Sequence, residues 1–155
     1  MGDGDPFPRP ENPDKLVSPT TQTPSIFPDF DIQLDFPKIL TVNKMPPLPD
    51  KLSTNGAAII IVKNNSGKDE PLYAATPCDV HHWDLLDSDG NLIESEKDGM
   101  CSFVTQHGIL KAGNSIRSDY VVGLNGKLLK EISYKLRFKF WEFEAEAIFE
   151  VRFLN

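Results

Sequence analysis

Apolar and polar residues alternate most regularly in three stretches of the chain. Residues 30–36 read FDIQLDF, in which every second side chain is apolar. Residues 133–143 and 145–155 repeat this period near the C-terminus. A period of two is typical of a β-strand that buries one face and exposes the other. The pattern therefore predicts strands in all three stretches.

Between these stretches, short apolar runs are separated by turn residues. Residues 38–44 continue the first strand or form a second short one, and residues 81–95 are expected to form a hairpin around the type I′ turn Asp89-Gly90. Residues 124–133 are the one segment where a short helix could compete with extended structure, because their leucines and Ile132 lie at helical spacing. The remaining predicted strands cover residues 57–64, 71–76, 101–110 and 115–124. This succession predicts an all-β chain, an antiparallel two-sheet sandwich of immunoglobulin-like type.

Proline divides the chain unequally. Of the 13 prolines, only Pro71 and Pro77 lie beyond position 49. Residues 1–27 also lack clustered apolar side chains, so we expect an extended or disordered Pro-rich arm. Residues 28–155 then form the sandwich domain, with its core in residues 56–155. The arm is either a linker or a docking segment that lies along a partner.

The amphipathic strand 30–36 allows two interpretations. It can complete the chain's own sandwich, which we favour, or it can add to the edge of another protein's sheet. The second interpretation, together with the arm, makes the protein an accessory subunit of a larger assembly.

Charge and composition exclude several classes of partner. The net charge is −7, with 16 basic and 23 acidic residues, so nucleic acid and anionic membrane surfaces are not expected partners. The chain has no apolar run long enough to span a membrane and no signal-peptide pattern at its start, which favours a cytoplasmic location. The two cysteines, Cys78 and Cys101, are expected to be reduced, buried thiols, with a single disulfide as the alternative.

The segment from His81 to Asn91 contains the only candidate metal chemistry. Neighbouring histidines on a strand point to opposite faces, so His81 and His82 cannot share a metal from regular β geometry. Asp87, Asp89 and Asn91 have the spacing of part of a calcium loop, but such a loop needs further oxygen ligands, ending in a bidentate glutamate, and a helix on each side; Leu92 and Ile93 follow instead. We therefore expect no metal and no cofactor here. No nucleophile motif or phosphate loop is present, and we expect no enzymatic activity.

Residues 59–72, 78–93 and 100–116 resemble segments of the intracellular proteinase inhibitor family of bacteria, the BsuPI-like proteins. They read IIIVKNNSGKDEPL, CDVHHWDLLDSDGNLI and MCSFVTQHGILKAGNSI, with Phe103, Gln106, Leu110 and Gly113 in matching places. The resemblance implies an immunoglobulin-like fold and proteinase inhibition by a loop.

The resulting hypothesis is a protein-binding sandwich that contacts a protease or an assembly subunit. Three polar, Gly-containing loops are candidate contact sites, at residues 64–70, 87–91 and 94–100. Two other residues have expected structural roles. Tyr134, near the start of the penultimate strand, is either a tyrosine corner or an ordinary half-buried tyrosine, and Trp83 lies in the predicted hairpin. The expected partner-binding residues are Asp87, Asp89, Gly90, Asn91, Lys97 and Asp98.

Overall fold

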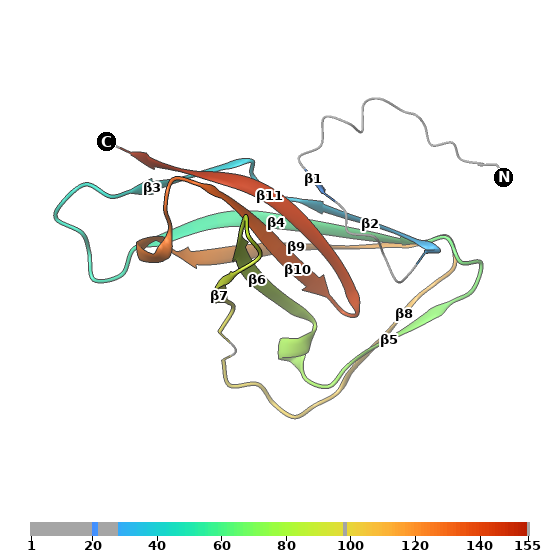
Figure 1. Ribbon diagram of the computed structural model, residues 1–155. Helices are drawn as coiled ribbons and strands as arrows, with labels where there is room; N and C mark the ends of the chain where they lie inside the picture. Colours follow the sequence, from blue (N-terminus) through green and yellow to red (C-terminus); the bar gives the residue numbers. More distant parts are fainter. Residues whose placement is uncertain (1–19, 22–27, 98, 155) are drawn as a thin grey trace.

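In the computed structural model, the structure describes residues 20–21, 28–97 and 99–154 (Figure 1). The described strands are β1 (Thr20–Thr21), β2 (Phe30–Asp35), β3 (Ile39–Asn43), β4 (Ser53–Asn64), β5 (Glu70–Ala74), β6 (His81–Asp87), β7 (Leu92–Ser95), β8 (Gln106–Leu110), β9 (Ser115–Asn125), β10 (Ser133–Phe140) and β11 (Phe143–Leu154). The predicted arm, residues 1–27, lies outside the described residues except for the backbone of β1.

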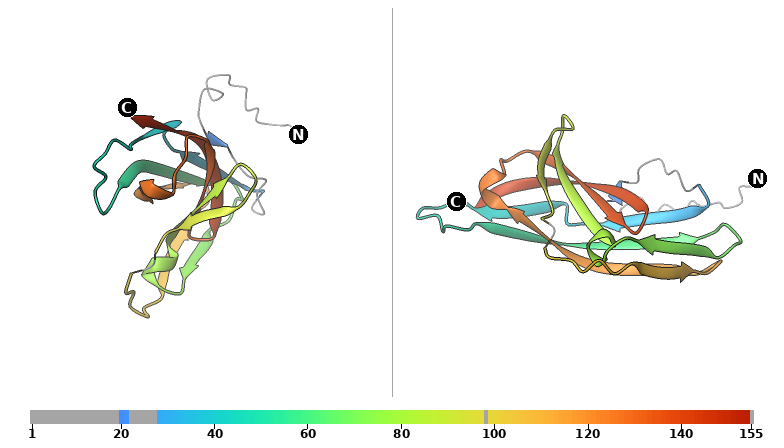
Figure 2. Two further views of the ribbon diagram at one scale, coloured as in Figure 1. Left: turned by 60° about the vertical axis from the view of Figure 1, so that its left-hand side comes forward. Right: turned by 90° about the horizontal axis from the view of Figure 1, so that it is seen from below.

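These strands form three sheets. The first has the order β1-β11-β10-β6-β7, with β3 also paired to β11. The second has the order β2-β4-β9, and the third contains β5 and β8. Figure 2 shows the first two sheets as packed layers, with β5 and β8 extending away from them. The chain is an all-β sandwich, as the alternating pattern predicted.

The core lies between the first and second sheets. Its centre is formed by side chains that the period of two placed on one face of each strand. Six of them, all fully buried, are Leu34 of β2, Ile60 and Val62 of β4, Leu136 and Phe138 of β10, and Phe149 of β11. Because β2 pairs with β4 of the same chain, residues 30–35 complete their own sandwich. The core is therefore not confined to residues 56–155.

One strand pair departs from the antiparallel prediction. β3 runs parallel to β11, with Leu40 opposite Val151. Pro37 and Lys38 carry the chain from the second sheet, which contains β2, to the first sheet, which contains β3. The chain changes sheets here without reversing its direction, and β11 runs in that same direction, so β3 and β11 pair in parallel. The proline thus separates two strands of different sheets.

Two predicted strand boundaries are wrong. Residues 101–105 are not in a strand, because β8 begins only at Gln106. The last two strands turn at Trp141 and Glu142, since Phe140 pairs with Phe143. The charged residues that follow Phe143 therefore belong to β11, where alternate residues face solvent.

The connecting turns also differ in part from the prediction. The hairpin of β6 and β7 is present, but its turn is not of type I′, because Gly90 has a positive φ of 87° and Asp89 does not. Residues 124–133 contain a short 3₁₀ turn at Gly126–Leu128 in place of the competing helix. Within the described ranges, no helix has the length and apolarity that crossing a membrane requires.

Asn64 joins the second sheet to the third. Its side chain is fully buried, and its Nδ2 donates hydrogen bonds to the carbonyls of Lys68 (2.7 Å) and Leu110 (2.9 Å). Its Oδ1 accepts hydrogen bonds from the backbone N–H and the hydroxyl of Ser66. The Asn64 backbone exchanges hydrogen bonds with Gly113 and Asn114, just before β9 begins. One amide thus fixes both turns from which β5 and β8 leave the sandwich.

Replacing Asn64 with alanine is expected to lower the free energy of unfolding by about 2–3 kcal/mol, because it leaves a buried carbonyl and a turn N–H without partners. Urea denaturation of the variant measures this loss. Asn65→Ala is the matched control, since the Asn65 amide bonds only an exposed carboxylate of Asp31, and its effect should stay under about 0.5 kcal/mol. Equal effects of the two substitutions would contradict the role assigned to Asn64.

Candidate functional site

A disulfide holds one loop at the end of the molecule where β5 and β8 extend. Cys78 follows β5 in the 3₁₀ turn Pro77–Asp79, and it is bonded to Cys101, with a Cα–Cα distance of 6.0 Å. The expectation of reduced, buried thiols is therefore wrong, and both cysteines are half-buried. Because the pairing depends on how the chain folds back, spacing in the sequence could not decide it. We call residues 99–105 the tethered loop.

The tethered loop exposes apolar side chains that have no place in the core. Met100 is 105% exposed, Phe103 is 95% exposed and Val104 is 58% exposed. A single exposed apolar residue is ordinary, but here three lie within five residues of one loop, which is typical of an interaction site. The sequence pattern predicted a strand over residues 101–110 and not this loop, because Phe103 and Val104 have the apolar character of strand residues.

The two-stranded sheet next to the loop also has an exposed outer face. Tyr73 of β5 lies opposite His107 of β8, with ring centroids 5.4 Å apart. Ile109, two residues along β8, points to the same face and is exposed. Leu72 and Leu110, on the other face, are buried. Exposed apolar side chains therefore occur on this sheet as well as on the tethered loop.

The predicted contact residues of the hairpin turn are used by the turn itself. The Asp87 carboxylate accepts hydrogen bonds from the backbone N–H groups of Asp89 and Asn91 and from the Asn91 amide. These bonds, chiefly the one from the Asn91 backbone, lower the pKa of Asp87 below its ordinary value. Gly90 supplies the positive φ that closes the turn. These four residues thus have a structural role in the turn.

The structure does not bring all six predicted contact residues together. The turn at residues 87–91 closes one end of the β6–β7 hairpin. Lys97 follows β7 at the open end of the hairpin, near the disulfide, and is exposed. Asp98 lies outside the described residues.

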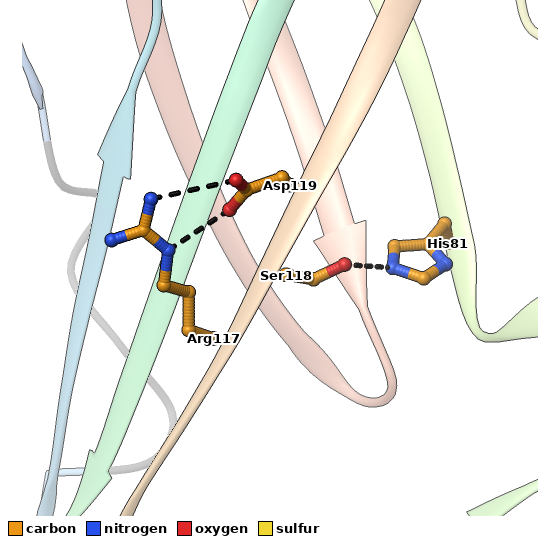
Figure 3. A network of polar contacts seen from close by, with 4 residues as sticks. All are labelled: His81, Arg117, Ser118 and Asp119. Atoms are coloured by element: carbon orange, nitrogen blue, oxygen red, sulfur yellow. Dashed lines mark hydrogen bonds and ion pairs between the residues drawn. The ribbon is translucent and has the colours of Figure 1, made fainter.

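The two neighbouring histidines point to opposite faces of β6, as predicted. His82 contacts Asp84 at 3.2 Å on the outer face. His81 points between the sheets, where its Nε2 lies 2.7 Å from the hydroxyl of Ser118 on β9 (Figure 3). Within the described part of the chain, no three His, Cys, Asp or Glu side chains gather at metal-binding distance.

His81 is held by aromatic rings on both sides. Its imidazole stacks on Tyr120 of β9 and on Phe140 of β10, with centroids 4.6 and 4.9 Å away. Burial lowers the pKa of His81 below its ordinary value of 6.5, because the charged form loses hydration. The contact between His81 and Ser118 has the reach of a base and nucleophile pair, but the stacked ring is fixed as a packing element. We therefore assign it a structural role.

The two residues predicted to be structural lie in the core region. Trp83 is buried in β6. Tyr134 is buried at the start of β10, and its hydroxyl accepts a hydrogen bond from the backbone N–H of Lys130 at 2.9 Å. A tyrosine corner makes the same kind of contact, to the backbone a few residues upstream.

Comparisons with known proteins yield structural similarity only. No family model matches the chain, and no curated protein matches it. A β-glucosidase from Listeria innocua aligns with a TM-score of 0.43 and 14% identity over 81% of this chain, which spans only 16% of that protein. The putative ApaA protein from Bordetella pertussis aligns with a TM-score of 0.42 and 13% identity, over 79% of this chain and 94% of that protein. These similarities assign no activity.

Acidification from about pH 8 to about pH 5 is expected to lower the free energy of unfolding. Because the pKa of His81 is lower in the folded chain, the unfolded chain binds this proton at a higher pH. The stability that comes from the neutral, buried imidazole is therefore fully present above pH 6.5 and is lost as pH falls through the folded pKa. Chemical denaturation across this range measures the slope. His81→Asn should flatten it, whereas the exposed His107→Asn should not. An unchanged slope in His81→Asn would contradict the assignment.

Replacing both Cys78 and Cys101 with serine is expected to cost about 3 kcal/mol of unfolding free energy, because the bond closes a loop of sequence separation 23 in the unfolded chain. Urea denaturation with and without dithiothreitol measures the loss. Reductant should bring the wild type to the level of the double variant and leave that variant unchanged. Two free thiols in the purified, air-oxidised protein would contradict the disulfide.

Proposed function

We propose that the protein is a non-enzymatic β-sandwich that binds another protein through the tethered loop. The exposure of Phe103 is the observation that carries this proposal. An aromatic side chain that is 95% exposed gains most from insertion into a partner's apolar pocket. Met100 and Val104 flank it and enlarge the apolar contact.

The disulfide supports this function by fixing the loop before binding. A free loop loses conformational entropy when it docks, and a cross-linked loop has lost part of it already. Cys101 lies within the loop and Cys78 within a turn next to β6, so the bond anchors the loop to the sandwich. Disulfides are typical of oxidising compartments, so the cytoplasmic location predicted from the sequence stays a prediction.

Proteinase inhibition is the form of this function that the resemblance to the BsuPI-like family implies. An inhibitor presents a rigid, exposed loop to the protease cleft, and Phe103 suits a primary pocket that is a hydrophobic slot. The accessory-subunit alternative has less support. Because β2 is paired within the chain's own sandwich, that alternative depends on the arm alone.

Phe103→Asp is expected to weaken the partner complex by about 2–4 kcal/mol, because it places a charge in an apolar pocket. Inhibition constants against chymotrypsin and subtilisin measure the protease form of the proposal. A pull-down from the native host, identified by mass spectrometry, measures protein binding in general. The variant should lose the partner that the wild type captures.

Ile148→Asp is the matched control, since Ile148 is an exposed apolar residue of β11 outside the tethered loop. It should bind as the wild type does. Equal binding by wild type and Phe103→Asp would contradict the role of the loop. The protein could capture a partner through Phe103 and yet inhibit neither protease. That result would exclude proteinase inhibition and leave the protein-binding function in place.

A further inference from the structure

The sandwich is open along the side where β7 and β9 face each other. β7 ends the first sheet and β9 ends the second, since β9 pairs only with β4 among the described residues. A cleft of about 460 Å³ lies between these two strands. Glu94 and Glu96 line it from the first sheet, and Val121 and Gly123 line it from β9.

The register of β9 shows which backbone groups face this cleft. In an antiparallel pair, every second residue directs its N–H and C=O to the neighbouring strand and the others direct them away. The N–H of Gly126 donates to the carbonyl of Leu52, next to β4, whereas the N–H of Asn125 donates to the Glu94 carboxylate. The N–H and C=O groups of the odd-numbered residues of β9 therefore point away from β4. Two of them, Val121 and Gly123, line the cleft, and their outward N–H and C=O groups have no backbone partner among the described residues.

Glu96 provides a second, independent observation at the same place. One of its carboxylate oxygens accepts a hydrogen bond from the hydroxyl of Tyr120 on β9. The other, Oε1, is buried and has no hydrogen-bond partner in the described part of the chain. A buried carboxylate oxygen without a donor is costly, and a cationic donor satisfies it best.

The other charged groups around the cleft do not supply that donor. Lys127 donates from its Nζ to the backbone carbonyl of Asp50. Lys51 and Lys97 also line the cleft, but neither donates a hydrogen bond to Glu96 Oε1. The carboxylates and lysines of the lining balance, so selectivity for a cation would come from the unpartnered oxygen and not from net charge.

We propose that this cleft binds an extended segment of a partner protein, which adds to the free edge of β9 at Val121 and Gly123. A lysine or arginine side chain of that segment binds Glu96. Main-chain hydrogen bonds give such a complex its affinity, and the side-chain pocket gives it specificity. This site is separate from the tethered loop, and the proposal does not depend on the function of that loop.

The experiment uses a phage-displayed library of random heptapeptides, selected on the full-length protein. Selected peptides should carry lysine or arginine at one fixed position. The synthetic consensus peptide is then measured by calorimetry against the wild type and the variants. Val121→Pro removes the N–H that faces the cleft and spares the pairing with β4, so binding should weaken about tenfold or more.

Asp119→Pro is the matched control. Asp119 has the same outward parity on β9 but does not line the cleft, so this variant should bind within about twofold of the wild type. Glu96→Gln keeps an acceptor for Tyr120 and removes the charge. In that variant, the consensus peptide and its lysine-to-norleucine form should bind alike, whereas the wild type should prefer the basic peptide. This comparison carries the test if Val121→Pro fails to fold.

Several results would overturn the proposal. These are no enriched peptide, equal binding by Val121→Pro and Asp119→Pro, or no basic preference in the wild type. A peptide consensus that matches part of residues 1–27 would also overturn it, because the cleft would then bind the chain's own arm and not a partner. Peptides whose binding is lost in Phe103→Asp would instead belong to the tethered loop. Because that variant should retain the cleft peptide, the two sites can fail separately.

Discussion

The arrangement of the molecule depends on one buried amide. At Asn64 the long pair formed by β4 and β9 ends and the chain continues as β5, while β8 returns to the same point. A buried polar side chain is stable only when its donors and acceptors are paired, and all of those of Asn64 are. This requirement fixes the direction in which β5 and β8 leave the sandwich. It therefore sets the position of the tethered loop, which lies between them in the chain.

The fold could be predicted where the information is local. Residues 30–36 and β10 show their buried face as a period of two, and the structure buries that face. Non-local features could not be predicted in this way. The change of sheet at Pro37 and the pairing of Cys78 with Cys101 depend on which segments meet in space. The pattern of a strand does not contain that information.

The candidate site was missed for a related reason. Loops of polar residues with glycine were expected to be contact sites. Asp87 and Asn91, however, use their polar groups for hydrogen bonds with each other, which stabilise their own turn. The tethered loop shows the opposite relation between residue type and position, because Phe103 and Val104 are apolar but exposed. In a sequence, apolar residues beside a strand appear to extend it. Only the fold shows whether such a residue is exposed or belongs to the core.

The two proposed binding surfaces are separate but lie on either side of a common space. A second cleft, of about 290 Å³, is lined by both half-cystines and by His81, Glu96 and Tyr120. The His81 ring stacks on Tyr120, whose hydroxyl binds Glu96, so the disulfide and the carboxylate border one small space. Cys101 belongs to the tethered loop and Glu96 to the proposed edge site, so this second cleft connects the two proposed surfaces. For a partner that contacted both surfaces, the second contact would be intramolecular and would strengthen binding without needing high affinity alone.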